Sequence, residues 1–196
     1  MPRRGHAAVR IGDYLYVLGG NYGKPGALDL NAPKRIARAR IFSDDSIGNF
    51  ESLATTLKTG RANFTCHVIG NYLYVFGGGT TQCERAAIQP DGSLGAFATE
   101  GVPVLKQART HHASQVVGNS FYVLGGWIPG SFLSSVEKAT LQPDGSLGSF
   151  EVVGETALPE VRRAGVSLRL GNTLLFVGGT PDGTQLSGKV FSAVIQ

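Results

Sequence analysis

The chain has 196 residues, of which 42% are hydrophobic, only 16% are charged and 28 are glycine. This composition excludes an architecture of long helices and favours short strands joined by turns. The net charge of +4 comes from lysines and arginines that are scattered without a run of five, so neither nucleic acid nor a membrane surface is an expected partner. The sequence contains neither an apolar segment of 18 residues nor a signal-peptide core, and it does not indicate a compartment.

The first predicted elements are two short strands joined by a tight turn. The segments "HAAVRI" and "YLYVL" are rich in aliphatic, aromatic and β-branched residues, as strands are. Glycine followed by Asp or Asn lies between them and supplies the positive φ that a two-residue hairpin needs. The same hairpin is predicted four times along the chain, with turns at Gly12-Asp13, Gly70-Asn71, Gly118-Asn119 and Gly171-Asn172.

Two further landmarks keep a fixed distance from each of these turns. A glycine pair begins seven residues after the turn glycine, and an arginine stands nine residues before it, in all four copies. We expect the pair to end an inner strand where neighbouring backbone comes too close for a side chain. The pairs begin at Gly19, Gly77, Gly125 and Gly178, and the arginines are Arg3, Arg61, Arg109 and Arg162.

A third and a fourth strand are predicted after each glycine pair. The segments "RIARARIF", "CERAAIQ", "VEKATLQ" and "GKVFSAVIQ" favour a third strand. In the second and third copies a Pro-Asp-Gly turn follows, and a fourth strand runs through Phe97 or Phe150. The first copy has "DDSIGNFE" at this place, with Phe50. Four antiparallel strands in a unit of this length predict the blade of a β-propeller.

The order of these landmarks resembles the kelch motif of kelch-type β-propellers. Arginine, in two copies with histidine three residues later, is followed by a strand, Gly-Asn, Tyr-Val, Gly-Gly and an aromatic residue in the last strand. The sequence differs from the usual pattern in having phenylalanine where tryptophan is common, and "PDGSLG" is similar to bacterial kelch-like repeats. The resemblance implies an all-β segment of four blades, a single array over residues 1–196. The expected blades are 1–57, 58–105, 106–158 and 159–196.

The fourth blade is expected to lack its outer strand. Gln196 aligns with Gln89 and Gln142, after which the Pro-Asp-Gly turn and the fourth strand begin. The chain therefore resembles a segment of a larger propeller with six or seven blades. Two alternatives stay open: a small ring of four blades that closes imperfectly, or two chains that pair through their open edges.

One loop face is the expected place of function. The interval from the second glycine of each pair to the glycine of the fourth-strand motif is 28, 17 and 22 residues, whereas the rest of the unit hardly varies. Such variation maps to one face of a repeat array, often the binding face. The candidate binding residues on that face are Tyr22, Arg61, Arg109, His111, Trp127 and Arg162, with the Pro-Asp-Gly turns on the opposite side.

Each of these candidates has a structural alternative. Trp127 is either an anchor for a partner or a packing residue on the neighbouring blade. The regular arginines either hydrogen-bond loop carbonyls or carboxylates, or form a positively charged mouth that receives acidic side chains or a sugar acid. In the second case we expect Arg61 and Arg109 to be accessible to solvent on the same side as Trp127 and Tyr22.

Catalytic and metal-binding patterns are scarce, so we expect no metal site, no cofactor and no catalytic residue. The four histidines do not occur in His-x-x-x-His spacing and the two cysteines do not form Cys-x-x-Cys. Because a whole strand is expected between Cys66 and Cys83, both are expected to be free thiols.

Three kinds of function remain. The first choice is a non-catalytic module that binds a protein or a carbohydrate through the loop face. The resemblance also admits an enzyme, similar to copper radical oxidases or sialic-acid mutarotases, and a mutarotase-like site could use Arg61, Arg109 and Arg162 with Glu160. The third is an architectural repeat of a surface protein.

Overall fold

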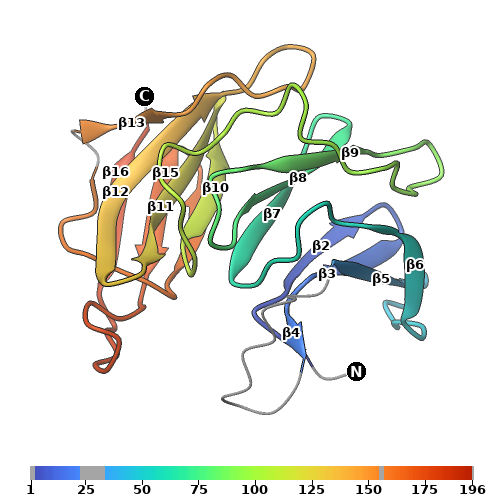
Figure 1. The fold of residues 1–196 in the computed structure, drawn as a ribbon, viewed down its shortest axis with the longest axis horizontal. Coiled ribbons are helices and arrows are strands. Elements are labelled where there is room, and N and C mark those ends of the chain that lie inside the picture. The colour runs from blue at the N-terminus through green and yellow to red at the C-terminus, as the bar shows by residue number, and fades with distance from the viewer. Residues whose placement is uncertain (1–2, 23–33, 155–156, 196) are drawn as a thin grey trace. The chain divides into compact units, whose positions relative to one another are not determined.

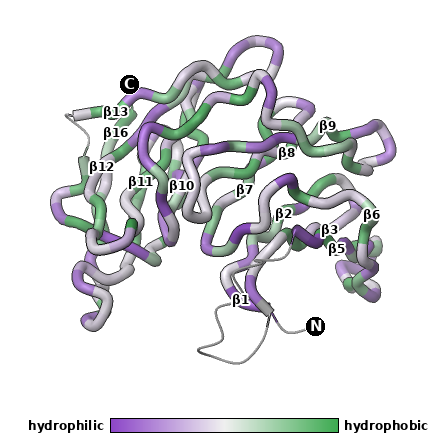
Figure 2. The backbone as a smooth tube through the Cα atoms, viewed as in Figure 1, coloured by the Kyte–Doolittle hydropathy of each residue, from purple (hydrophilic) through white to green (hydrophobic). Residues whose placement is uncertain are grey.

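The computed structural model describes residues 3–22, 34–154 and 157–195, and no α-helix occurs among them (Figure 1). The chain is folded into strands in which more buried and less buried positions alternate. In each of these strands, one face is more buried and the other is more exposed. Hydrophobic and hydrophilic residues both occur along the strands (Figure 2). The predicted all-β architecture is confirmed.

Four antiparallel sheets follow one another along the chain. Sheet 1 contains β2 (Ala7–Ile11), β3 (Tyr14–Leu18), β5 (Arg35–Arg40) and β6 (Glu51–Thr56). Sheet 2 contains β7 (Phe64–Ile69), β8 (Tyr72–Gly77) and β9 (Glu84–Ala87). Sheet 3 contains β10 (Ala113–Val117), β11 (Ser120–Ile128), β12 (Ser131–Thr140) and β13 (Glu151–Val152). Sheet 4 contains β14 (Val166–Leu170), β15 (Thr173–Val177) and β16 (Val190–Val194), and a small extra ladder joins β1 (Arg3–Arg4) to β4 (Asn21–Tyr22).

Consecutive strands are neighbours in every sheet, which is the up-and-down order of a propeller blade. Sheet 4 has three strands in the described part of the chain, as expected from the sequence. Sheet 2 also has three, because its predicted fourth strand is reduced to two isolated bridges, Arg85–Ala98 and Ile88–Leu94. The four predicted units are therefore present, and their outer strands differ most.

The predicted hairpins form with two-residue turns. In sheet 1, Ile11 pairs with Tyr14 across Gly12-Asp13, and in sheet 3, Val117 pairs with Ser120 across Gly118-Asn119. Gly12 and Gly118 have φ of 54° and 58°, which a residue with a Cβ atom adopts at a cost. The turn chemistry in the sequence thus fixes the register of each inner strand pair.

The glycine pairs lie where the next repeat comes closest. Gly126 donates its backbone N–H to the carbonyl oxygen of Arg162 at 2.7 Å, and Gly20 makes the same bond to Arg61 at 3.0 Å. A Cβ atom on Gly125 would lie 2.6 Å from that Arg162 oxygen. The glycine pair and the backbone at the arginine position of the next repeat therefore form one contact, which explains why glycines recur at this spacing.

The chain divides into two compact units. The first comprises residues 1–76 and 83–102, and the second comprises residues 77–82 and 103–196. In the first unit, sheets 1 and 2 enclose a core that includes Tyr16, Leu18, Leu73 and Val75. In the second, sheets 3 and 4 enclose a core that includes Tyr122, Leu124, Leu174 and Phe176.

Candidate functional site

The arginines of the second and third repeats are buried in ion pairs. Nη2 of Arg61 donates to Oε1 of Glu84 at 2.6 Å, and Nη2 of Arg109 donates to Oε1 of Glu137 at 2.6 Å. The side chains of both pairs are 0% exposed. The expectation that Arg61 and Arg109 are open to solvent is wrong, because each guanidinium is buried against the glutamate of its third strand.

The carboxylates also hold the loop that leads into each repeat. Glu137 accepts hydrogen bonds from the backbone N–H groups of Lys106 and Gln107 at 2.7 and 3.1 Å. Glu84 does the same for Lys58 and Thr59 at 2.8 Å each. A buried ion pair whose carboxylate also accepts backbone hydrogen bonds fixes local geometry, so these contacts support the structural interpretation of both arginines.

Arg162 of the fourth repeat is also buried but is paired differently. Its side chain is 1% exposed, and Nη2 contacts Glu160 and, at 3.0 Å, Oγ of Ser187. Phe191 pairs with Phe176 at the place where Glu137 pairs with Val123, so the strand supplies no carboxylate. The guanidinium lies 5.5 Å from the Phe191 ring centre, and its Nε and Nη1 have no partner in the part of the chain that the structure describes.

His111 belongs to a second regular feature, a left-handed residue two positions after each arginine. Gly5, Asn63, His111 and Ala164 have φ between 54° and 64°. Asn63 donates its N–H to the Gly5 carbonyl at 2.7 Å, and Ala164 donates to the His111 carbonyl at 2.8 Å. The backbone of His111 therefore links the third repeat to the fourth, which the sequence pattern did not indicate.

The His111 side chain is half-buried next to Thr110. A ring nitrogen, Nδ1, lies 3.1 Å from Oγ1 of Thr110. Burial, and secondly the positive charge of Arg163, lower the pKa of His111 below its ordinary value. The imidazole is thus neutral at neutral pH and offers hydrogen bonds rather than charge.

Trp127 lies on a hairpin that projects beyond the glycine pair. After a bulge, β11 and β12 continue to pair through Gly126–Leu133, Trp127–Phe132 and Ile128–Ser131. The sequence predicted a loop here, and the structure has a β-hairpin with Pro129 and Gly130 exposed at its turn. Backbone hydrogen bonds of 2.8 and 2.9 Å join Trp127 to Thr110, so the hairpin base is held next to His111.

Arg163 completes this group and was not singled out from the sequence. Its guanidinium carbon lies 5.1 Å from the centre of the Phe132 ring, and its backbone bridges Thr180. Within the described residues, its guanidinium takes part in no ion pair. The adjacent arginines Arg162 and Arg163 could have indicated it, because neighbouring residues of an extended segment point to opposite sides and only one of the two enters the core. We call Trp127, Phe132, His111 and Arg163 the Trp127 patch.

The neighbouring loop is held by a single aspartate. Asp182 accepts hydrogen bonds from the backbone N–H groups of Thr184 and Gln185 at 2.8 Å each. These bonds, that of Gln185 first, lower the pKa of Asp182 to about 2. A carboxylate held in this way keeps the loop beside Arg163 in one shape.

The remaining candidates lie in the first unit. Tyr22 pairs with Arg3 through its backbone, and its side chain lies outside what the structure describes. Arg61 lies in the buried pair with Glu84. The structure thus brings His111 and Trp127 together within the second unit, whereas Arg109 is buried against sheet 3 and Arg162 against Ser187 and Phe191 of the fourth repeat.

The described residues offer little for metal binding or for thiol chemistry. They contain no group of three or more His, Cys, Asp and Glu side chains that could hold a metal ion. Cys66 and Cys83 form no disulfide, and burial raises the pKa of Cys66 to about 12, far from that of a reactive thiolate. Among the same residues no helix is long and apolar enough to cross a membrane.

Comparison with known proteins connects this geometry to a family. The family model of the kelch motif matches residues 108–138, a span that begins next to Arg109 and ends next to Glu137. No curated protein matches the sequence. The match shows a kelch motif within residues 108–138, and the four antiparallel sheets with strands in sequential order are consistent with kelch blades. The kelch motif indicates a repeat module that binds other proteins.

Proposed function

We propose that the chain binds an acidic protein segment through the Trp127 patch. The observation that carries this proposal is the projecting hairpin, which holds Trp127 and Phe132 opposite each other with the Arg163 guanidinium against the Phe132 ring. Tryptophan and arginine are the residues that most often dominate binding energy at protein interfaces. A rigid hairpin presents them with little loss of conformational entropy on binding.

The charge of the patch favours a carboxylate as the contact of Arg163. The three fully or nearly buried arginines are committed to glutamates, whereas Arg163 is half-buried and pairs with no carboxylate of the described residues. Its planar guanidinium can bind a carboxylate through two hydrogen bonds while its face stays on Phe132. The neutral His111 beside it can add a hydrogen bond without adding charge.

The proposal is tested with peptides selected from a random library on the immobilised chain. We expect the binders to be enriched in Asp and Glu, and their affinity to fall as salt concentration rises. Trp127→Ala should weaken binding by at least about 1 kcal/mol, roughly fivefold in Kd. Arg163→Ala should weaken it and flatten the salt dependence.

Ser146→Ala is the matched control, because Ser146 lies in the Pro-Asp-Gly turn after the other end of β12. The ten residues of β12 place its two ends about 30 Å apart. Urea unfolding of every variant separates lost contacts from lost folding. Equal loss of binding in Ser146→Ala and Trp127→Ala, or binders without acidic residues, would overturn the proposal.

A further inference from the structure

In the first unit, the segment that follows the third strand of sheet 2 fills the space between two sheets. Leu94 and Phe97, from the segment after the Pro-Asp-Gly turn of the second repeat, are 8% and 2% exposed in the core between sheets 1 and 2. The Tyr16 hydroxyl of sheet 1 donates to the carbonyl oxygen of Gly92 in that turn at 2.7 Å. Ile88, at the end of the third strand, forms a bridge with Leu94. This segment therefore closes the contact between two neighbouring repeats.

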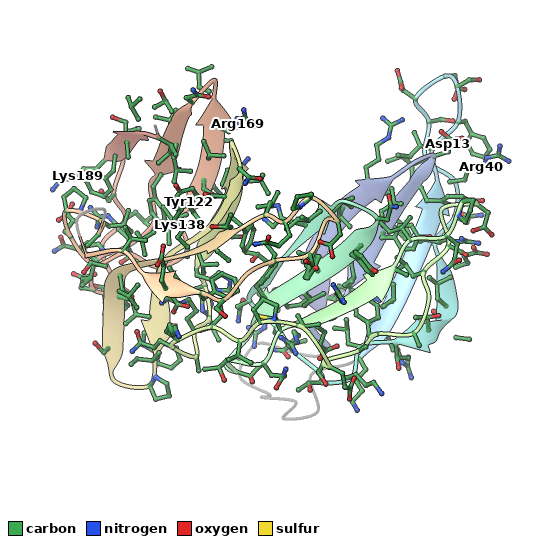
Figure 3. The ribbon with its side chains drawn as sticks, turned by 90° about the horizontal axis from the view of Figure 1, so that it is seen from above. Asp13, Arg40, Tyr122, Lys138, Arg169 and Lys189 are labelled. Atoms are coloured by element: carbon green, nitrogen blue, oxygen red, sulfur yellow. The ribbon has the colours of Figure 1, made fainter. Side chains whose placement is uncertain are left out.

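In the second unit, the corresponding space between sheets 3 and 4 is a cavity of about 180 Å³. Several of its lining residues occupy the same repeat positions as residues around Leu94 and Phe97: Tyr122, Leu124 and Leu174 stand at the places of Tyr16, Leu18 and Leu73. Tyr122 pairs with Lys138 as Tyr16 pairs with Arg38, and these two neighbours are labelled in Figure 3. The principal lining residues are Tyr122, Leu124, Leu158, Leu174, Phe191 and Ile195.

Backbone hydrogen bonds confirm this alignment of the two spaces. Ile195 donates to the carbonyl of Asn172 at 2.8 Å, as Ile88 donates to the carbonyl of Asn71 at 2.8 Å. Ile195 is therefore the counterpart of Ile88, but no bridge continues from it in the described part of the chain. The Tyr122 hydroxyl, the counterpart of the Tyr16 hydroxyl, likewise has no hydrogen bond to a described residue.

The outer edge of sheet 4 has backbone groups at the place where sheet 2 hydrogen-bonds the segment that contains Phe97. In sheet 2, Arg85 exchanges two hydrogen bonds of 3.0 and 2.9 Å with Ala98, the residue after Phe97. The same register makes Ser192 the counterpart of Arg85, since Ser192 pairs with Leu175 as Arg85 pairs with Tyr74. β16 has β15 as its neighbour on one side and no neighbour among the described strands on the other. Its outer edge can accept one more antiparallel strand.

We propose that this groove, formed by the cavity and the outer edge of β16, accepts an antiparallel β-strand with the chain's own repeat pattern Pro-Asp-Gly-x-Leu-x-x-Phe, from a partner other than a second copy of this chain. The leucine and phenylalanine enter the cavity, the Tyr122 hydroxyl binds the carbonyl of the turn glycine, and the residue after phenylalanine pairs with Ser192. A cavity of about 150 Å³ lined by apolar side chains holds a benzene ring, so the volume suits a phenylalanine side chain. The proposal uses other residues than the Trp127 patch, and the two stand or fall separately.

The experiment titrates a synthetic peptide with the sequence of residues 89–100 into the chain and measures heat of binding. We expect saturable binding with one peptide per chain, together with slower amide hydrogen exchange in β16. Peptides that carry Leu94→Asp or Phe97→Asp should bind at least about tenfold more weakly, because each substitution places a charge in an apolar cavity. These peptide variants leave the fold of the protein untouched.

Ser192→Pro and Ser192→Ala form a matched pair on the protein. Proline removes the N–H that an added strand requires, whereas alanine keeps it. Binding should be lost in Ser192→Pro and retained in Ser192→Ala. The proposal is overturned if the wild-type peptide does not bind or if the aspartate peptides bind equally well. It is also overturned if self-association of the chain, abolished by Ser192→Pro, excludes the peptide, since the occupant would then be a second copy.

Discussion

The third and fourth repeats are built on the same landmarks but differ in what those landmarks contact. In the third repeat, Arg109 is paired with Glu137 from the adjacent strand, and both side chains are fully buried. In the fourth, Phe191 replaces the glutamate, and Arg162 relies on Glu160, which is 34% exposed and also contacts Lys189. The charge of Arg109 is therefore balanced by a buried carboxylate of the sheet, whereas the charge of Arg162 is balanced by a partly exposed carboxylate at the edge of its repeat.

The difference shows what the arginine contributes in general. Its carbonyl oxygen contacts the glycine pair of the preceding repeat in both cases, through Gly78 for Arg109 and Gly126 for Arg162. The backbone contact between repeats thus stays constant while the side-chain partner changes. We infer that repeat-to-repeat docking depends on the backbone contact, and that the ion pair fixes the entry loop of its own repeat.

The largest expected effect comes from breaking the buried pair of the third repeat. Glu137→Ala leaves Arg109 buried without a countercharge and frees the N–H groups of Lys106 and Gln107. Removing one partner of a buried pair costs about 3–5 kcal/mol, and urea unfolding should show a loss of this size. A loss under about 1 kcal/mol would mean that the guanidinium reaches water, contrary to its burial.

The next largest effect comes from replacing the first glycine of a pair, and its size should differ between the third and the fourth repeat. Gly125 and Gly178 have φ of 59° and 71°, so alanine meets similar backbone strain at both, about 1–2 kcal/mol. A Cβ atom on Gly125 would lie 2.6 Å from the Arg162 carbonyl oxygen, whereas on Gly178 the nearest atom is 3.3 Å away. Gly125→Ala should therefore cost about 1–3 kcal/mol more than Gly178→Ala in urea unfolding. Equal losses would leave φ strain as the whole reason for the pair.

Sequence reasoning located the hairpins, the glycine pairs and the four-strand order because these depend on local chemistry. A Gly-Asn turn and a positive φ are properties of a few adjacent residues. The partners of Arg61 and Arg109 depend instead on which side chains packing brings together, 23 and 28 residues along the chain. A signal was present, since Glu84 and Glu137 stand at the same place in the third strands of two repeats, each followed by a basic residue.

The candidate site was predicted less completely than the fold. Trp127 and His111 were named from loop position and residue type, and the structure places them side by side. Phe132 was missed because the pairing of β11 and β12 past the glycines depends on a bulge that no local pattern marks. Arg163 was missed because only tertiary packing decides which of two adjacent arginines enters the core.

The smallest expected effect concerns the exposed partner of Arg162. The hydrogen bond from Lys189, and secondarily the charge of Arg162, lower the pKa of Glu160 below its ordinary value of 4.5. A carboxylate whose pKa is lower in the folded state stabilises the fold above the pKa of the unfolded chain, and this stabilisation is lost as pH falls through the folded pKa. Glu160→Gln should therefore lower the urea midpoint at pH 7 and have little effect at pH 3. The loss of stability at pH 7 should be smaller for Glu160→Gln than for Glu137→Gln, because solvent and Lys189 already screen this carboxylate.

Equal losses of stability from Glu160→Gln and Glu137→Gln at pH 7 would contradict this prediction. The exposed pair would then stabilise the fourth repeat as much as the buried pair stabilises the third, and the contrast between the two repeats would be wrong.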